Sequence, residues 1–257
     1  AAKAIDRWAA LRATVLLVNS QTTRKAVAAA YGRDAAVCFP GVDADAMRQA
    51  AELTRERVVL SVGALTPNKG FDFLIESLAT IPADDRPPLV VISNYQEPAE
   101  KAYLEALAAA RGVGLMLLVN VSEHELRTWY ARAGCVAYAP VREPLGLVAL
   151  EAMAAGAPLV GVDEGGVAET IRHGTTGILV PRNTSAFGCA IQDLLSNPAA
   201  AVALGRAAAP YVRQTWGWDL HVCRLVEQLE RYSQPVPLAS TRVNMASPGA
   251  VPPPRSV

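Results

Sequence analysis

The sequence predicts an α/β protein built on a doubly wound parallel sheet of the Rossmann-like type. Short apolar runs typical of buried strands alternate with segments whose apolar residues recur every three or four positions, as they do on one face of a helix. Such alternation is typical of parallel sheets whose strands are connected by helices. The chain has 257 residues, of which 51% are hydrophobic, so it can bury an ample core.

Each element follows from its local pattern. Apolar runs bounded by Gly, Pro or polar residues predict strands, and apolar positions at three- and four-residue intervals predict helices. The expected strands are residues 14–18, 35–39, 57–62, 88–92, 115–119, 135–138, 158–162 and 177–180. The expected helices are residues 1–12, 70–79, 98–111, 122–133, 147–155, 167–172, 185–196 and 220–232.

Composition narrows the class of function. The 24 basic and 24 acidic residues balance, which indicates neither a nucleic-acid partner nor an electrostatic membrane anchor. The longest apolar runs fall short of the roughly 20 residues that a transmembrane helix needs, and no signal peptide opens the chain. Cys38, Cys135, Cys189 and Cys223 are scattered, so we expect reduced core residues in a cytoplasmic protein. Peripheral attachment to a membrane stays open.

Two glutamates eight residues apart are the most informative feature. Glu151 is the only charged residue from Pro144 through Val162, and an ionised carboxylate buried without a partner is costly. Eight helical residues rise about 12 Å. We therefore expect Glu143 and Glu151 to stand about 10 Å apart, beyond the about 5–9.5 Å needed to flank one glycosidic bond. The spacing suits the two ends of an elongated ligand.

Between the two glutamates, a helix is expected to begin at Gly146. The free amides of Gly146, Leu147 and Val148 would favour an anion there. A carboxylate, an anion site and a second carboxylate are complementary to the parts of a nucleotide sugar. The sugar would bind at Glu143, the diphosphate at the amides and the ribose at Glu151. The structural alternative is that Glu143 merely complements the helix N-terminus and that Glu151 faces solvent.

Residues 143–158, which read EPLGLVALEAMAAGAP, resemble the signature of glycosyltransferase family 4 (group 1), retaining enzymes of the two-domain GT-B fold. Residues 19–43, 62–70 and 165–177 resemble other segments of that family, so the resemblance covers about residues 14–232. It implies one half of a GT-B fold. Residues 18–232 would be the nucleotide-sugar donor-binding domain, 1–17 the end of a missing N-terminal acceptor domain, and 233–257 a Pro-rich disordered tail.

The resemblance also implies roles for individual residues. Glu143 and Lys69 would be the catalytic residues, with Lys69 neutralising the departing diphosphate. Gly63, Gly165 and Gly166 would lie in donor-site loops. The donor would be a UDP-, GDP- or ADP-sugar, with neither a cofactor nor a metal ion.

The chain also departs from the family at several positions. Ala64 stands where many members have a second phosphate-binding Arg. Residues 93–95 and Asn120 replace glycines that are common at the corresponding turns. These replacements leave the nucleotide base open.

Further residues have competing interpretations. The run Asp43-Ala44-Asp45 is similar to a metal-binding motif, but a helix N-cap explains Asp43 better. Trp216 and Trp218 are either hinge residues before the last helix or ordinary core residues. Glu169 braces its loop, touches the sugar or is a solvated helix residue. Two other functions stay open: a non-catalytic nucleotide-sugar binding module, and a sugar-nucleotide epimerase, which shares the two-domain architecture.

Overall fold

The computed structural model describes residues 2–47 and 54–233. Its main part, which we call the sheet lobe (residues 54–216), is built on six parallel strands in the order β5-β4-β3-β6-β7-β8. The order reverses between β3 and β6, and open parallel sheets bind ligands at such switch points. The strands are β3 (Glu56–Val62), β4 (Leu89–Ser93), β5 (Leu115–Val119), β6 (Ala133–Tyr138), β7 (Leu159–Val162) and β8 (Ile178–Val180).

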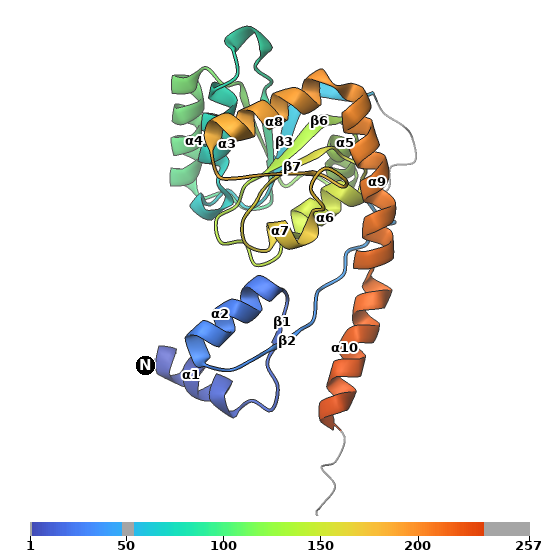
Figure 1. Cartoon of the computed structure of the whole chain (residues 1–257). Helices are drawn as coiled ribbons and strands as arrows, with labels where there is room; N and C mark the ends of the chain where they lie inside the picture. The colour runs from blue at the N-terminus through green and yellow to red at the C-terminus, as the bar shows by residue number, and fades with distance from the viewer. Residues whose placement is uncertain (1, 48–53, 234–257) are drawn as a thin grey trace, which may run out of the picture.

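Helices cover both faces of this sheet (Figure 1). Every residue of β4, β6 and β7 is buried, as expected for strands sandwiched between two helical layers. The predicted parallel α/β fold is therefore confirmed. The helices are α3 (Phe71–Ala79), α4 (Pro98–Arg111), α5 (Glu123–Arg132), α6 (Leu147–Ala154), α7 (Val167–Thr170), α8 (Thr184–Ser196) and α9 (Pro198–Trp216), with 3-10 turns at Pro67–Lys69 and Ala83–Asp85.

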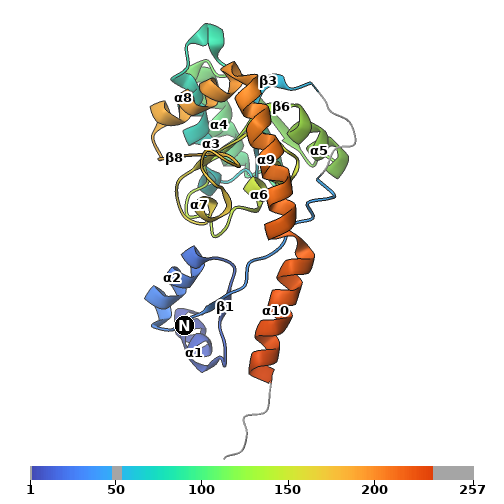
Figure 2. The ribbon, with the colours of Figure 1, turned by 45° about the vertical axis from the view of Figure 1, so that its right-hand side comes forward.

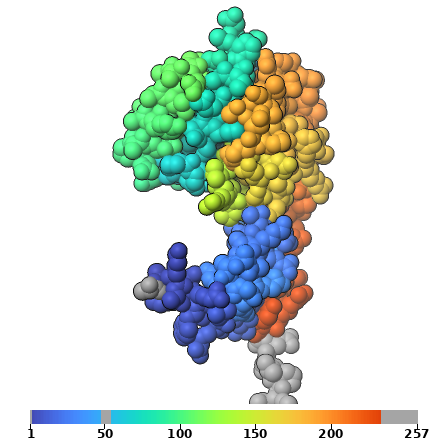
Figure 3. All heavy atoms as spheres, turned by 60° about the vertical axis from the view of Figure 1, so that its left-hand side comes forward, coloured from blue at the N-terminus to red at the C-terminus, as the bar shows by residue number. Residues whose placement is uncertain are grey.

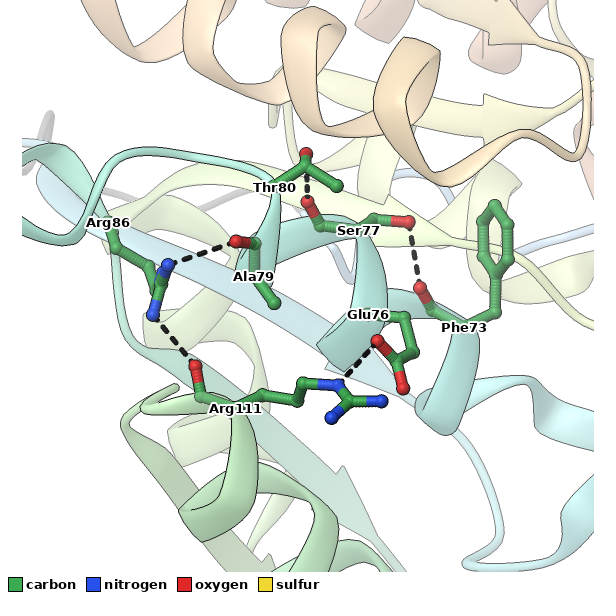
Figure 4. Close-up of polar contacts among 7 residues, drawn as sticks. All are labelled: Phe73, Glu76, Ser77, Ala79, Thr80, Arg86 and Arg111. Carbon is green, nitrogen blue, oxygen red and sulfur yellow. Dashed lines mark hydrogen bonds and ion pairs between the residues drawn. The ribbon is translucent and has the colours of Figure 1, made fainter.

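One arginine ties the ends of two helices together on one face (Figure 4). Arg86 donates to the Ala79 carbonyl at the end of α3 at 2.9 Å and to the Arg111 carbonyl at the end of α4 at 2.8 Å. The Arg111 side chain pairs with Glu76 on α3 at 2.8 Å. Carbonyls at helix C-terminal ends have no partner inside the helix, so these bonds fix α3, whose opposite end faces the candidate site.

The N-terminal unit (residues 2–37) corrects one expectation. It contains α1 (Ala2–Arg12), β1 (Leu17–Val18), α2 (Gln21–Tyr31) and β2 (Ala36–Val37). We expected all strands to share one sheet, but β1 and β2 pair only with each other. The expected boundary between residues 17 and 18 falls inside β1, and α2 packs on α1. The expected tail lies outside the described residues beyond Ser233.

Helices α2 and α9 were not expected from the sequence. α9 has 19 residues despite an internal proline at Pro210. It packs on α6, where a side chain at Gly205 would lie 2.0 Å from the Gly156 carbonyl oxygen. This close backbone contact requires glycine and fixes α9 against the sheet lobe.

The last helix, α10 (Trp218–Ser233), leaves the sheet lobe and runs beside the N-terminal unit (Figures 1 and 2). Helices α9 and α10 are separated at Gly217. This residue forms an isolated β-bridge with Val42, which lies in the connection between the N-terminal unit and the sheet lobe. Trp216 is buried and packs edge-on against Phe39 with ring centroids 5.2 Å apart, whereas Trp218 is half exposed. Among the described residues, no helix is both long and apolar enough to cross a membrane.

Candidate functional site

The loops that follow β3, β6, β7 and β8 meet at the carboxyl edge of the sheet. This edge includes the switch point between β3 and β6, and it faces the N-terminal unit (Figure 1). Figure 3 shows α2 in blue directly beneath the yellow residues of the sheet lobe, with an open hollow between the dark-blue residues of α1 and the cyan and green residues of the sheet lobe. The predicted site residues lie on these loops and on α6.

Lys69 and Glu143 form an ion pair across the switch point. The Lys69 Nζ atom lies 2.9 Å from the Glu143 carboxylate, and the two side chains are only 23% and 15% exposed. Their loops are also joined through the backbone, because the Val141 amide donates to the Asn68 carbonyl at 2.8 Å. The two residues predicted to be catalytic, 74 positions apart, are therefore neighbours.

Gly63 lies against the same lysine. A side chain at Gly63 would meet Lys69 Cγ at 3.4 Å, so the end of β3 forms one wall beside the Lys69 stem. Ser93, at a position where the family often has glycine, accepts from the Leu65 amide at 3.1 Å. This side chain shapes the loop from Gly63 onward.

The Gly165-Gly166 pair brings a third loop to Glu143. The Gly166 amide donates to the Glu143 carbonyl at 2.9 Å, and a Cβ atom at Gly166 would lie 2.1 Å from the Pro144 carbonyl oxygen. Gly165 has φ +56°, in the left-handed region that favours glycine. The glycines let this loop pack directly on the backbone that carries Glu143.

Helix α6 begins beside these loops, as predicted. Gly146 is its N-cap with φ +98°, and Gly146 offers no side chain to cap the helix. The first amides of a helix have no carbonyl partner inside the helix, so Leu147 and Val148 present donors at a positive helix end. Gly146 also lies over the Tyr138 ring, since a Cβ atom there would be 3.4 Å from Tyr138 Cε1.

Glu151 lies about one turn into α6 and is half-buried. The fully buried Tyr130 donates from its hydroxyl to the Glu151 carboxylate at 3.2 Å. Burial raises the pKa of Glu151, while the hydrogen bond from Tyr130 acts in the opposite direction. The carboxylate does not project freely into solvent, which disagrees with the structural alternative for this residue.

Arg182, whose role was not expected from the sequence, holds the loops together. Its guanidinium donates to Glu164 at 2.8 Å, to the Ala139 carbonyl at 3.0 Å and to the Pro140 carbonyl at 2.7 Å. It also lies over the Phe73 ring, with 5.2 Å from the Arg182 Cζ atom to the ring centroid. Its position two residues after β8 was a weak signal, because its acceptors are remote in sequence.

Two further candidates have structural roles. Asp43 accepts from the Ala46 amide at 2.9 Å and so caps a turn. Glu169 reaches the N-terminal unit, where it accepts from the amides of Gln21 and Thr22 at 2.8 and 2.7 Å and from the Thr22 hydroxyl at 2.7 Å. Within residues 2–47 and 54–233, no group of three His, Cys, Asp or Glu side chains could hold a metal ion.

A cavity of about 760 Å³ lies at the opposite edge of the sheet, where β3 and β6 begin. None of the predicted site residues lines it. Arg55 in its wall is occupied, because it donates to the carbonyls of Ala133 at 2.8 Å and Gly156 at 2.6 Å. Arg55 therefore caps the chain just after helices α5 and α6. This cavity is separate from the predicted site at the carboxyl edge.

The fold defines an α/β domain with a candidate ligand site at the switch point of a parallel sheet. The sequence profile of the family Glycosyl transferases group 1 matches residues 43–210. The chain belongs to this family.

Curated relatives carry related names. The chain is 34% identical over 241 residues to a GDP-mannose-dependent alpha-(1-6)-phosphatidylinositol monomannoside mannosyltransferase of Mycobacterium tuberculosis, covering 84% of this chain and 61% of the relative. It is 30% identical over 205 residues to a D-inositol 3-phosphate glycosyltransferase of Streptomyces avermitilis, covering 72% and 44%. The chain thus spans less than two thirds of either relative.

Solved structures share the fold. Sucrose-phosphate synthase from Thermosynechococcus elongatus matches with a TM-score of 0.79 and 23% identity, over 89% of this chain and 61% of that one. Anabaena HepE, in complex with UDP-glucose, matches with a TM-score of 0.78 and 22% identity, over 87% and 65%. These likenesses agree with the expected half of a GT-B fold.

Proposed function

We propose that this chain is the donor-binding part of a retaining, metal-independent glycosyltransferase that uses a nucleoside-diphosphate sugar. The observation that carries the proposal is the Lys69–Glu143 pair, held at the switch point beside the start of α6. A cation, a free helix N-terminus and a carboxylate are thereby gathered where parallel sheets bind ligands. Family membership and the UDP-glucose bound to HepE support this assignment.

Each residue has a role in the proposal. Glu143 holds the sugar, the amides of Leu147 and Val148 hold the diphosphate, and Glu151 holds the ribose hydroxyls. Lys69 exchanges its contact with Glu143 for the diphosphate and stabilises the charge that develops when the diphosphate leaves. Gly63, Gly165 and Gly166 shape the surrounding loops.

The acceptor would bind outside this chain. Because the chain spans 44–61% of the two curated relatives described above, we propose that the acceptor domain belongs to the remaining length. The chain by itself would then bind the donor but transfer little sugar. We further propose a cytoplasmic location with peripheral membrane contact left open, since Cys38, Cys135, Cys189 and Cys223 are free. Only Cys135 is buried, so the expectation of four core cysteines is wrong.

A thermal-shift panel tests donor binding. UDP-glucose, GDP-mannose and ADP-glucose would be compared at 100 times their dissociation constants, where binding adds about 2.7 kcal/mol of stability. For a domain of this size that corresponds to a rise in Tm of about 5–10 °C. No rise with any of the three would contradict the proposal.

Two variants separate the site from the rest of the surface. Lys69→Ala is expected to weaken binding of the nucleotide found in the panel, because the diphosphate loses its cation. Lys101→Ala is the matched control, since Lys101 lies on α4 in a loose 3.8 Å pair with Glu105. Equal affinities of the two variants in calorimetric titration would remove Lys69 from the site.

A non-catalytic nucleotide-sugar binding module is the second candidate, and the observation that favours it is Ala64 in place of a phosphate-binding Arg. The two candidates differ in turnover. Transfer of sugar by the full-length protein supports the enzyme, whereas donor binding without transfer to any acceptor supports the module. Isomerised nucleotide sugar as the product would instead identify an epimerase.

A further inference from the structure

Two buried tyrosines lie beneath the two glutamates of the candidate site. Tyr130 comes from α5 and is 0% exposed, and Tyr138 ends β6 and is 2% exposed. Tyr130 donates to Glu151 at 3.2 Å. Burial and the nearby Glu143 carboxylate raise the pKa of Tyr138, so this phenol lies beside Glu143. Each carboxylate thus has its own phenol on the side that faces the core.

We propose that Tyr130 and Tyr138 are positioning residues, which aim Glu151 at the ribose and Glu143 at the sugar of the donor. The inference rests on the proposed function and adds two residues that this function does not require.

The geometry favours positioning over simple packing. A buried hydroxyl needs a hydrogen-bond partner, and for Tyr130 the Glu151 carboxylate is that partner. A phenylalanine would fill the same volume without this need. The Tyr138 ring also lies against Gly146, so this side chain is near both the start of α6 and Glu143.

Charge explains why the carboxylates need these donors. The titratable and charged groups that face the pair are Tyr130 from α5, Tyr138 from β6 and Lys69 from the loop after β3. Glu143 has the Lys69 cation as well as a phenol. Glu151 has only the phenols among these groups, and burial raises its pKa. The Tyr130 hydroxyl therefore favours the ionised form that accepts ribose hydroxyls.

Substitution of the two tyrosines is expected to change the affinities for UDP and UDP-glucose differently. Tyr130→Phe should weaken UDP and UDP-glucose equally, by about tenfold, because a hydrogen bond to a charged group is lost at the ribose end. Tyr138→Phe should weaken UDP-glucose by about tenfold but leave UDP within about twofold, because only the sugar end is affected. GDP and GDP-mannose serve as the second pair of probes.

Isothermal titration of the whole chain measures both effects. Tyr103→Phe is the matched control, because Tyr103 is exposed on α4. Unchanged circular dichroism shows that the phenylalanine variants fold. A role in positioning also predicts that Tyr130→Phe shifts the loss of UDP affinity on acidification to higher pH, since the ionised carboxylate has lost a donor. A purely structural role would not move this profile.

A double-mutant cycle separates this inference from the proposed function. If Glu151→Gln weakens UDP binding, Tyr130→Phe should add no more than about twofold in the Glu151→Gln background. A Tyr130→Phe variant with wild-type affinity and pH profile, beside a defective Glu151→Gln, overturns the inference and leaves the function intact. Unchanged binding in both Glu151→Gln and Glu143→Gln overturns the proposed function as well.

Discussion

Gly166→Ala is the sharpest structural test of the loop arrangement. The added Cβ atom would lie 2.1 Å from the Pro144 carbonyl oxygen and 2.4 Å from Leu145 Cα. Real contacts of this kind stay above 3.0 Å, so the two loops must separate by roughly 1 Å. Gly166 has φ −72°, which alanine adopts without strain, so the cost is crowding alone.

The magnitude follows from three terms. Overpacking typically costs about 1–3 kcal/mol. Separation of the loops also breaks the bond from the Gly166 amide to the Glu143 carbonyl, worth about 1 kcal/mol. The less flexible unfolded chain offsets about 0.4–1 kcal/mol. We expect a net loss of about 2 kcal/mol of unfolding free energy, or about 4–8 °C in Tm.

Urea unfolding measures this loss, and Gly114→Ala is the control. A Cβ atom at Gly114 would meet the Pro88 side chain at an ordinary 3.4 Å, so the control should stay within about 0.5 kcal/mol of wild type. The donor affinity of Gly166→Ala should fall with stability, because Glu143 is displaced. Equal unfolding free energies for the two variants would refute the close contact between the loops.

Three further predictions concern charged residues. Burial raises the pKa of Glu151, so between the usual and the raised pKa the folded state binds more protons than the unfolded state. The free energy of unfolding therefore rises as pH falls from the raised pKa to the usual pKa. Glu151→Gln should flatten this rise when urea unfolding is measured across pH. Arg182→Ala should lower the unfolding free energy by about 2 kcal/mol, since three acceptors lose a charged donor; a change below about 0.5 kcal/mol would contradict its role. Glu169→Ala should speed amide hydrogen exchange at Gln21 and Thr22, and unchanged exchange would exclude this contact.

The local elements were largely predictable from the sequence. α4 (Pro98–Arg111) and β5 (Leu115–Val119) have the predicted bounds, and α6 begins where Gly146 indicated. In each case a continuous apolar pattern and a nearby breaker residue carry the information. α9 was missed because its small alanine-rich face and Pro210 obscure the helical period.

The pairing of distant segments was decided by the tertiary structure. Apolar periodicity shows which face of a strand or helix is buried, but it does not name the partner, so the separate β1-β2 sheet could not be foreseen.

The sequence by itself determined that a strand–helix alternation carries Glu143 and Glu151 on either side of a helix start. Only the fold decided that Lys69 pairs with Glu143, that Arg182 joins three loops and that Tyr130 lies beneath Glu151. These contacts depend on strand order, because reversal between β3 and β6 brings remote loops to one edge of the sheet.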